Sequence, residues 1–214
     1  MPCLMTSFSG MGFLQADFFQ RDFLIVAREL VGVELVWRGC SGIIVETEGY
    51  AVEGDAACHT ATRKGARQFV HEKPAGAAYV YLNYGMYWLF NLHVKGGGRD
   101  GLILIRAMEP RRGIAQMRLR RGSRADADLC SGPGKLGLAL GISGEDHGLI
   151  VAGPGRVAGC GLRRLSQDRS PPESGAVAED VRVGIRLATD LKWRFLRENS
   201  PSVSVPLGKV KQPR

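Results

Sequence analysis

The spacing of apolar residues predicts a helix near the start of the chain. Between Asp22 and Val31, apolar side chains recur every three or four positions, as on one face of a helix. Asp22 stands where a helix N-cap is expected, and Gly32 follows where a helix would end. We therefore expect a short helix from Asp22 to Val31.

The segments that follow have the alternation and the β-branched residues of strands. Five strands are expected, at 33–37, 42–50, 78–82, 87–94 and 102–108. The third and fourth flank Asn83-Tyr84-Gly85-Met86, in which Asn and Gly favour a turn, so this region predicts a β-hairpin with Tyr84 at its tip. Pro110 is expected to stop the fifth strand, because proline cannot donate a ladder hydrogen bond.

The second half of the chain has weaker patterns. The basic segment Arg111 to Arg124 is weakly helical, and Leu136 to Ile142 indicates another short helix. Val177 to Leu187 fits either a strand or a helix. Ser166 to Gly175 is rich in Ser, Pro and Glu, which predicts a surface loop.

These elements together indicate the fold class. No internal repeat or long linker divides the chain, so we expect a single domain over residues 1–214, with flexible ends at 1–16 and 206–214. Short strands joined by hairpins, with helices around them, are typical of an α+β fold. We expect a mostly antiparallel, curved β-sheet with a protruding hairpin and peripheral helices.

The composition excludes several protein classes. Of the 214 residues, 44% are hydrophobic and 23% charged, which is typical of folded proteins rather than disordered or fibrous ones. There are 29 Lys and Arg against 21 Asp and Glu, which gives a net charge of +8. A polyanionic partner would explain this charge, although a surplus of solvated basic side chains would give the same number.

The cysteines and the N-terminus favour a reducing compartment. Five cysteines without a C-x-x-C pair argue against a disulfide framework and a structural zinc site. No basic stretch precedes an apolar one at the N-terminus, and the uncharged run around 74–94 contains Pro, Gly and Asn. We expect a cytoplasmic protein with no signal peptide and no membrane segment.

Three motifs are considered and set aside. Gly96 to Gly101 satisfies G-x-G-x-x-G, but a strand is predicted after it where a dinucleotide site requires a helix. Ser131 to Lys135 resembles a phosphate loop, but Leu136 replaces the Ser or Thr that would bind magnesium; Lys135 could still contact one phosphate of a nucleic acid. Several residues with metal-binding side chains lack the spacing of a zinc site; they are Cys58, His59, His71 and Glu72. No metal and no cofactor are expected.

Two carboxylates share one face of the strand at 42–50. Alternation places Glu46 and Glu48 on the same side, with Cα atoms about 7 Å apart. Like charges at that distance favour protonation of one carboxyl, as acid–base chemistry requires, unless both are solvated on an exposed face. Arg106 interrupts the apolar strand at 102–108, and a buried arginine needs a carboxylate partner, for which these two glutamates are the candidates.

Polar and aromatic residues of the hairpin suggest a binding site for a planar base. Asn91 interrupts an apolar strand, and its amide either bonds the local backbone or contacts a polar ligand. Four tyrosines lie close together in the sequence, at Tyr79, Tyr81, Tyr84 and Tyr87. They could be core packing or, with Tyr50 and His59, a stacking site. An exposed Tyr84 on a basic protein has the character of a wedge that opens a duplex.

Four stretches carry a recognisable family pattern: Ile44 to Tyr50 followed by His59, Tyr79 to Tyr87 with Asn91, Leu104 to Pro110, and Leu129 to Leu136. Together they resemble the motifs of the alkyladenine (3-methyladenine) DNA glycosylases. Phe18 to Gly32 is similar to the opening of that family and Val181 to Ile185 to its closing part, so the resemblance covers nearly the whole chain.

The resemblance implies an activity and a catalytic group. These enzymes are monofunctional glycosylases that flip a damaged purine out of duplex DNA and hydrolyse its N-glycosidic bond without a metal. Their substrates are of the 3-methyladenine, 7-methylguanine, hypoxanthine and ethenoadenine class. Glu48 would be the general base for the attacking water, with Arg106 and a backbone carbonyl near Val183 helping to hold that water. The partner would be double-stranded DNA with damaged purines, bound by a monomer.

The resemblance also implies how the DNA is bound. Tyr50, His59 and Tyr81 would line the base pocket. Asn91 would exclude the amino group of guanine, and Tyr84 would fill the gap left in the duplex. Lys135 would contact a phosphate.

The chain departs from the family in three places. Where the family usually carries T-P-R-N and then M-F, this chain has the basic segment Arg63 to Glu72, expected as a shorter DNA-facing loop. Gly49 stands where Ala is common, and Arg111 to Arg124 is unusually rich in arginine.

Two other functions fit parts of the sequence. A non-catalytic damaged-DNA-binding module would bind a duplex equally well with Gln in place of Glu48. A hydrolase of free nucleosides would have little use for the basic charge or for an exposed Tyr84.

Overall fold

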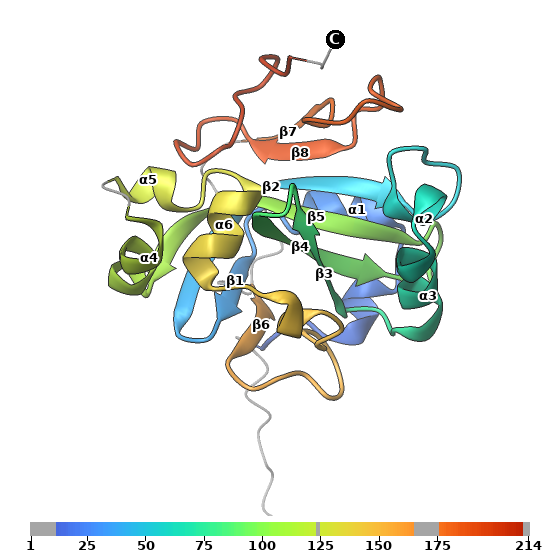
Figure 1. Cartoon of the computed structure of the whole chain (residues 1–214), viewed down its shortest axis with the longest axis horizontal. Helices are drawn as coiled ribbons and strands as arrows, with labels where there is room; N and C mark the ends of the chain where they lie inside the picture. Colours follow the sequence, from blue (N-terminus) through green and yellow to red (C-terminus); the bar gives the residue numbers. More distant parts are fainter. Residues whose placement is uncertain (1–11, 123–124, 165–175, 212–214) are drawn as a thin grey trace, which may run out of the picture.

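One antiparallel sheet organises the chain, as Figure 1 shows. The computed structural model describes residues 12–122, 125–164 and 176–211. The strands run in the order β3-β4-β5-β2-β1-β6, and β8 pairs with both β2 and β7. Their bounds are β1 Glu34–Trp37, β2 Cys40–Ala51, β3 Ala78–Asn83, β4 Tyr87–Val94, β5 Gly101–Arg112, β6 Cys160–Arg163, β7 Val177–Asp180 and β8 Arg194–Arg197.

The helices are short and lie around this sheet. The α-helices are α1 Phe23–Glu29, α2 His59–Thr62, α3 Lys64–Glu72, α4 Ile114–Arg121, α5 Asp126–Leu129 and α6 Pro133–Leu140, and two 3-10 turns are η1 Ala16–Phe19 and η2 Gly144–Asp146. In Figure 1, α2 and α3 lie at one end of the sheet and α4, α5 and α6 at the other. Both strands and helices contribute to the domain, so the α+β expectation is confirmed.

Irregular pairing between β2 and β5 helps to curve the sheet. The register shifts at three points along β2, and such bulges increase twist and redirect side chains. Glu46 lies opposite Ala107, whereas Thr47 lies opposite Ile105, so Arg106 is the extra residue of a bulge. The longest strands of the sheet are therefore most irregular where the two glutamates face Arg106.

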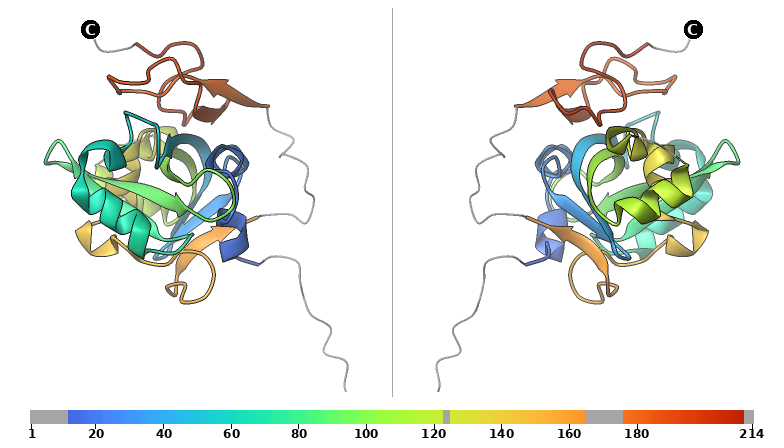
Figure 2. Two further views of the ribbon diagram at one scale, coloured as in Figure 1. Left: turned by 90° about the vertical axis from the view of Figure 1, so that its right-hand side faces the viewer. Right: turned by 90° about the vertical axis from the view of Figure 1, so that its left-hand side faces the viewer.

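The first predicted elements are confirmed. Asp22 caps α1, because its side chain accepts a hydrogen bond from the Leu24 N–H. All five predicted strands are present, with small differences at their ends. The β3–β4 hairpin has Tyr84 at its tip, with 83% of the side chain's surface exposed, and Figure 2 shows this hairpin projecting from the body of the molecule.

Two expectations about individual segments are wrong. Strand β5 continues through Pro110 to Arg112, because β4 pairs with β5 only as far as Leu104 and proline is tolerated where one side of a strand is free of such pairing. The segment expected as a DNA-facing loop is mostly the helix α3. Ala66 and Phe69 give this helix a buried face, and the Phe69 ring packs against Tyr79.

The remaining segments extend the picture. Helices form within the basic segment, as α4, and near Leu136, as α6. Val177 to Leu187 begins as strand β7 and then continues without a helix or strand. The loop expected at 166–175 lies outside the described residues. Of the two chain ends, the described parts make contacts: Leu14 N–H donates to the Leu162 carbonyl, and Gly208 N–H donates to Asp180. The boundaries of the domain and the flexibility of its ends stay predictions.

No helix within the described residues has the length and apolar character needed to cross a membrane. Four cysteines are placed by the structure, and each is a buried free thiol: Cys40, Cys58, Cys130 and Cys160.

Candidate active site

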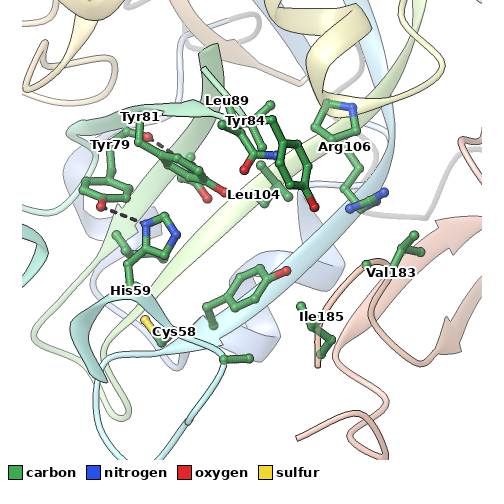
Figure 3. A pocket seen from close by; sticks show the side chains of 17 residues that line it. Cys58, His59, Tyr79, Tyr81, Tyr84, Leu89, Leu104, Arg106, Val183 and Ile185 are labelled. Carbon is green, nitrogen blue, oxygen red and sulfur yellow. Dashed lines mark hydrogen bonds between the residues drawn. The ribbon is translucent and has the colours of Figure 1, made fainter. Parts of the chain in front are cut away.

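A cavity of about 310 Å³ opens between the β3–β4 hairpin, the end of β2, the first half of β5, the start of α2 and the segment after β7. Figure 3 shows the side chains of Tyr79, Tyr81 and His59 on one side and those of Val183 and Ile185 on the other. The predicted site residues that line it are Tyr50, His59, Tyr81, Tyr84, Asn91 and Arg106. The fold thus gathers, around one cavity, six residues that are spread over more than fifty positions of the sequence.

Glu48 is fully buried behind the cavity wall and accepts three hydrogen bonds. Its Oε1 accepts from the Val183 N–H over 2.6 Å. Its Oε2 accepts from the Tyr50 hydroxyl over 2.8 Å and from Arg106 Nη1 over 3.1 Å. All three donor residues line the cavity. A carboxylate has about four lone-pair sites, so one remains for a further donor such as a water molecule.

Arg106 connects the two glutamates that the sequence places on one face. Its Nη1 donates to Glu48, and its Nε lies 3.3 Å from Glu46 Oε1. Burial alone would lower the pKa of Arg106, but the nearby Glu48 and Glu46 carboxylates outweigh it and raise that pKa above its usual value. The expectation that Arg106 is buried and paired with these carboxylates is confirmed, and the alternative of two solvated glutamates is excluded.

Glu46 has a different set of partners from Glu48. Its Oε1 also accepts from Arg194 Nε over 2.6 Å, and its Oε2 accepts from the Ser204 N–H over 2.7 Å. Arg194 in turn donates to Asp180. Glu46 therefore ties β2 to β8 and to the C-terminal segment, whereas Glu48 is bound by three residues that line the cavity.

The aromatic part of the wall is uncharged at neutral pH. His59 Nδ1 lies 3.0 Å from the Tyr79 hydroxyl, and its ring lies edge-on to Tyr81 at 4.2 Å between centroids. Burial, together with the Arg63 guanidinium, lowers the pKa of His59 to about 4. Burial raises the pKa of Tyr79 and Tyr81 to about 12. The wall therefore presents neutral, electron-rich rings to a ligand.

Tyr50 joins this wall to the buried carboxylate. Burial and the negative charge of Glu48 raise the pKa of Tyr50 well above its usual value, so its hydroxyl stays protonated and donates a hydrogen bond to Glu48. The opposite side of the site includes the guanidinium of Arg182, 4.7 Å from the centre of the Tyr50 ring.

Asn91 and Tyr84 lie at different depths. Asn91 is buried, and its Nδ2 donates to the Tyr79 carbonyl over 3.1 Å, so the amide bonds the local backbone while it also lines the cavity. The expected bond to the local backbone is therefore confirmed, and contact of Asn91 with a ligand stays a prediction. Tyr84 reaches the cavity from the hairpin tip with a positive φ of 50°, which a bulky residue rarely adopts.

Lys135 is separate from the cavity lining. It lies in the first turn of α6, and its Nζ forms an ion pair with Asp128 and lies 3.0 Å from Ser131 Oγ. Its contact with a phosphate stays a prediction, and any such contact has to compete with Asp128.

Sequence reasoning missed several residues that support the site. Asp55, Arg182 and Arg194 are buried, Ser204 is half-buried, and their hydrogen bonds hold the site together. No local pattern marks them, because each acts through a partner distant in the sequence. An arginine inside the apolar stretch Val181–Ile185 or before Phe195-Leu196 is the one available signal, and it is the same signal that singled out Arg106.

Metal ligation has no support in the described parts of the chain. No group of three or more His, Cys, Asp or Glu side chains in them is arranged to hold an ion.

Comparison with known proteins gives a consistent result. The sequence pattern of the family described as methylpurine-DNA glycosylase matches residues 17–201. A protein of Rhodopseudomonas palustris (strain HaA2) is 40% identical over 193 residues, covering 90% of both chains. A protein of Agrobacterium fabrum is 41% identical over 188 residues, covering 88% of this chain and 90% of its own. A third, of Chlorobaculum tepidum, is 38% identical over 196 residues, covering 89% and 90%. All three carry the name "Putative 3-methyladenine DNA glycosylase".

Proposed function

Because this chain belongs to the methylpurine-DNA glycosylase family, and is therefore a DNA repair hydrolase of base excision repair, we propose that its cavity receives alkylated or deaminated purines flipped out of duplex DNA. Its substrates would be of the 3-methyladenine, 7-methylguanine, hypoxanthine and ethenoadenine class. The cavity volume of about 310 Å³ suits one purine base.

The aromatic wall supports the selection of damaged bases. Alkylated purines such as 3-methyladenine carry positive charge, which is attracted to the faces of Tyr50 and Tyr81 by about 0.5–2 kcal/mol per contact. His59 stays neutral at physiological pH and does not repel such a cation. Asn91, whose amide is fixed by the Tyr79 carbonyl, limits the space for the exocyclic amino group of guanine.

Glu48 would supply the catalytic base. The attacking water gives its proton to the Glu48 carboxylate while its oxygen forms a bond to the sugar C1′. The glycosidic C–N bond breaks, and its electron pair leaves with the base, which departs neutral when the substrate is cationic. The negative charge of Glu48 also stabilises the oxocarbenium-like sugar, as in glycoside hydrolysis generally. Arg106, Tyr50 and the Val183 N–H orient this carboxylate.

The exposed hairpin would open the duplex. Tyr84 has 83% of its surface exposed, next to the exposed Met86, so the tip can enter the space that a flipped nucleotide leaves. The net charge of +8 favours binding to the DNA phosphates, with Lys135 as one contact. We propose that the protein acts on double-stranded DNA as a monomer.

The observation that carries this proposal is the buried Glu48 carboxylate, held by three donors from three cavity-lining residues. Purified protein is mixed in excess with duplexes that contain hypoxanthine or ethenoadenine and with alkylated DNA, and the released base and the alkali-sensitive sites are measured. Glu48→Gln keeps the size of the side chain and should lower the rate by at least about 100-fold. Glu53→Gln is the matched control, because Glu53 is an exposed glutamate close by in the sequence.

The outcomes distinguish this function from the alternative. Base release by the native protein and by Glu53→Gln, but not by Glu48→Gln, supports the glycosylase and its base together. Tight, salt-sensitive duplex binding with no release from any substrate would overturn the proposal and indicate a damaged-DNA-binding module instead.

A further inference from the structure

A second buried ion pair lies against the site, from residues that carry no assigned role. Arg182 donates to both oxygens of Asp55, from Nη1 to Oδ2 over 2.5 Å and from Nη2 to Oδ1 over 3.0 Å. Both side chains are fully buried. Asp55 lies after β2, on the segment that continues to the cavity-lining Cys58 and His59, whereas Arg182 lies after β7 and directly before the cavity-lining Val183.

Arg182 contacts the backbone next to Glu48 and directly precedes the residue whose amide binds the Glu48 carboxylate. Its Nη1 also donates to the carbonyl of Gly49, the residue between Glu48 and Tyr50, over 3.1 Å. The next residue, Val183, donates its N–H to Glu48 Oε1 over 2.6 Å. A shift of the Arg182 backbone would therefore move the amide that holds the Glu48 carboxylate, and a shift of its side chain would release the Gly49 carbonyl.

The guanidinium of Arg182 also contacts the ring of Tyr50, which lines the cavity. Its centre lies 4.7 Å from the Tyr50 ring centroid and 5.1 Å from that of Trp193. A planar guanidinium stacks on aromatic faces while its N–H groups donate at its edges, which a lysine ammonium cannot do in the same way. Arg182 thus contacts Tyr50 directly and Glu48 through two backbone groups.

Stability alone is a weak reason for such a pair. Replacing a fully buried ion pair with apolar residues of similar volume is often neutral or stabilising, because both charges lose their hydration. Here the arginine is held in one orientation by Asp55, by the Gly49 carbonyl and by the faces of two aromatic rings. It can therefore fix the positions of the groups that it contacts.

We propose that Arg182 and Asp55 are positioning residues for the glycosylase reaction: together they hold the Val183 amide and the Tyr50 ring so that Glu48 is aligned for attack. This inference rests on the proposed role of Glu48. It assigns no contact between the DNA and either Arg182 or Asp55. The rate of base release should therefore depend on these two residues, whereas the affinity for the duplex should not.

The test separates the rate of base release from DNA binding and from folding. Asp55→Asn, Arg182→Lys and Arg182→Met are compared with native protein for single-turnover release of hypoxanthine at saturating enzyme. Binding is measured with a duplex that carries a tetrahydrofuran abasic analogue, which has no base to stack on Tyr50. Glu34→Gln is the control for lost stability, because it breaks the ion pair of β1 with Arg163 on β6, outside the cavity lining.

The expected result is a loss of rate by about 10- to 100-fold in Asp55→Asn, the size of effect that follows from misplacing a catalytic group by about 1 Å. Arg182→Met should lose more than Arg182→Lys, and all variants should bind the abasic duplex within about threefold of native protein. If Asp55→Asn does not fold, Trp193→Leu gives the same comparison by removing one ring from the Arg182 stack while leaving the ion pair in place.

Two outcomes would overturn the inference itself. Variants as active as Glu34→Gln would show that the pair positions nothing. Equal losses of rate and of duplex affinity would show a general structural role. Absence of base release from the native protein would instead remove the proposed function on which the inference rests, so the two failures are distinguishable.

Discussion

Arg106 joins Glu48 across the two longest strands of the sheet, with its Nη1 3.1 Å from Glu48 Oε2. The Glu48 side chain is completely buried and that of Arg106 is 8% exposed. Arg106 can reach both Glu48 and Glu46 because it is the extra residue of a bulge in β5. The bulge thereby places one cation between two carboxylates that would otherwise repel each other.

Removal of Arg106 should therefore destabilise the fold as well as the site. Arg106→Met leaves two buried carboxylates without their shared cation, and the free energy of unfolding should fall by about 3–5 kcal/mol. Urea unfolding at pH 7 measures this loss. Adding Glu48→Gln to the same chain should restore part of it, because Arg194 still pairs with Glu46 and Glu48 is the carboxylate left uncompensated; a loss below about 1 kcal/mol in the single variant would contradict the prediction.

Tyr84 should contribute to duplex opening but not to stability. Because its side chain is 83% exposed, Tyr84→Ala should change the unfolding free energy by no more than about 0.5 kcal/mol. Hypoxanthine release should slow more from a duplex than from a single strand, which has no base stack to open. Leu119→Ala is the control, since Leu119 is 79% exposed on α4 and away from the cavity. Equal slowing on both substrates would rule out a role in opening the duplex.

The histidines should make the fold less stable in acid. The pKa values of His59 and His93 fall to about 4, chiefly through burial, compared with 6.5 in an unfolded chain. Between these values the unfolded chain binds more protons than the folded one, so these two groups lower stability as pH falls from about 6.5 to about 4. NMR titration should find both rings neutral at pH 6.

Arg63 should act on one of these histidines alone. Its guanidinium contributes to the low pKa of His59 but not to that of His93. Arg63→Gln should therefore raise the pKa of His59 and leave that of His93 unchanged in the same titration. A parallel shift of both values would indicate a general change of structure rather than the loss of a local charge.

Gly49 should resist replacement by alanine. A Cβ at this position would lie 2.8 Å from Phe23 Cε2 and 3.2 Å from Leu24 Cδ2, both on α1. Gly49→Ala should cost about 1–3 kcal/mol of unfolding free energy through overpacking. Phe23→Leu in the same chain should reduce that cost, which chemical denaturation of the four variants would measure as a double-mutant cycle.

The sequence by itself determined the local elements and the chemistry of the site. Helix α1 and strands β1 to β5 follow from apolar spacing, because burial of one face requires that spacing whatever the rest of the chain does. The buried pairing of Arg106 with glutamates followed from the cost of an unpaired charge. The family and the enzyme class followed from motifs that retain their order along the chain.

Tertiary structure decided what depends on distant partners. Pro110 remains in β5 because β4 pairs with β5 only as far as Leu104. Residues 64–72 form α3 because the Phe69 ring packs against Tyr79, which lies on β3. Asp55 and Arg182 are 127 positions apart, and no local pattern pairs one with the other. Hydrophobic periodicity is read over a few residues, whereas a buried ion pair or a bulge exists only when two remote segments meet. That physical difference separates what the sequence alone could predict from what required the fold.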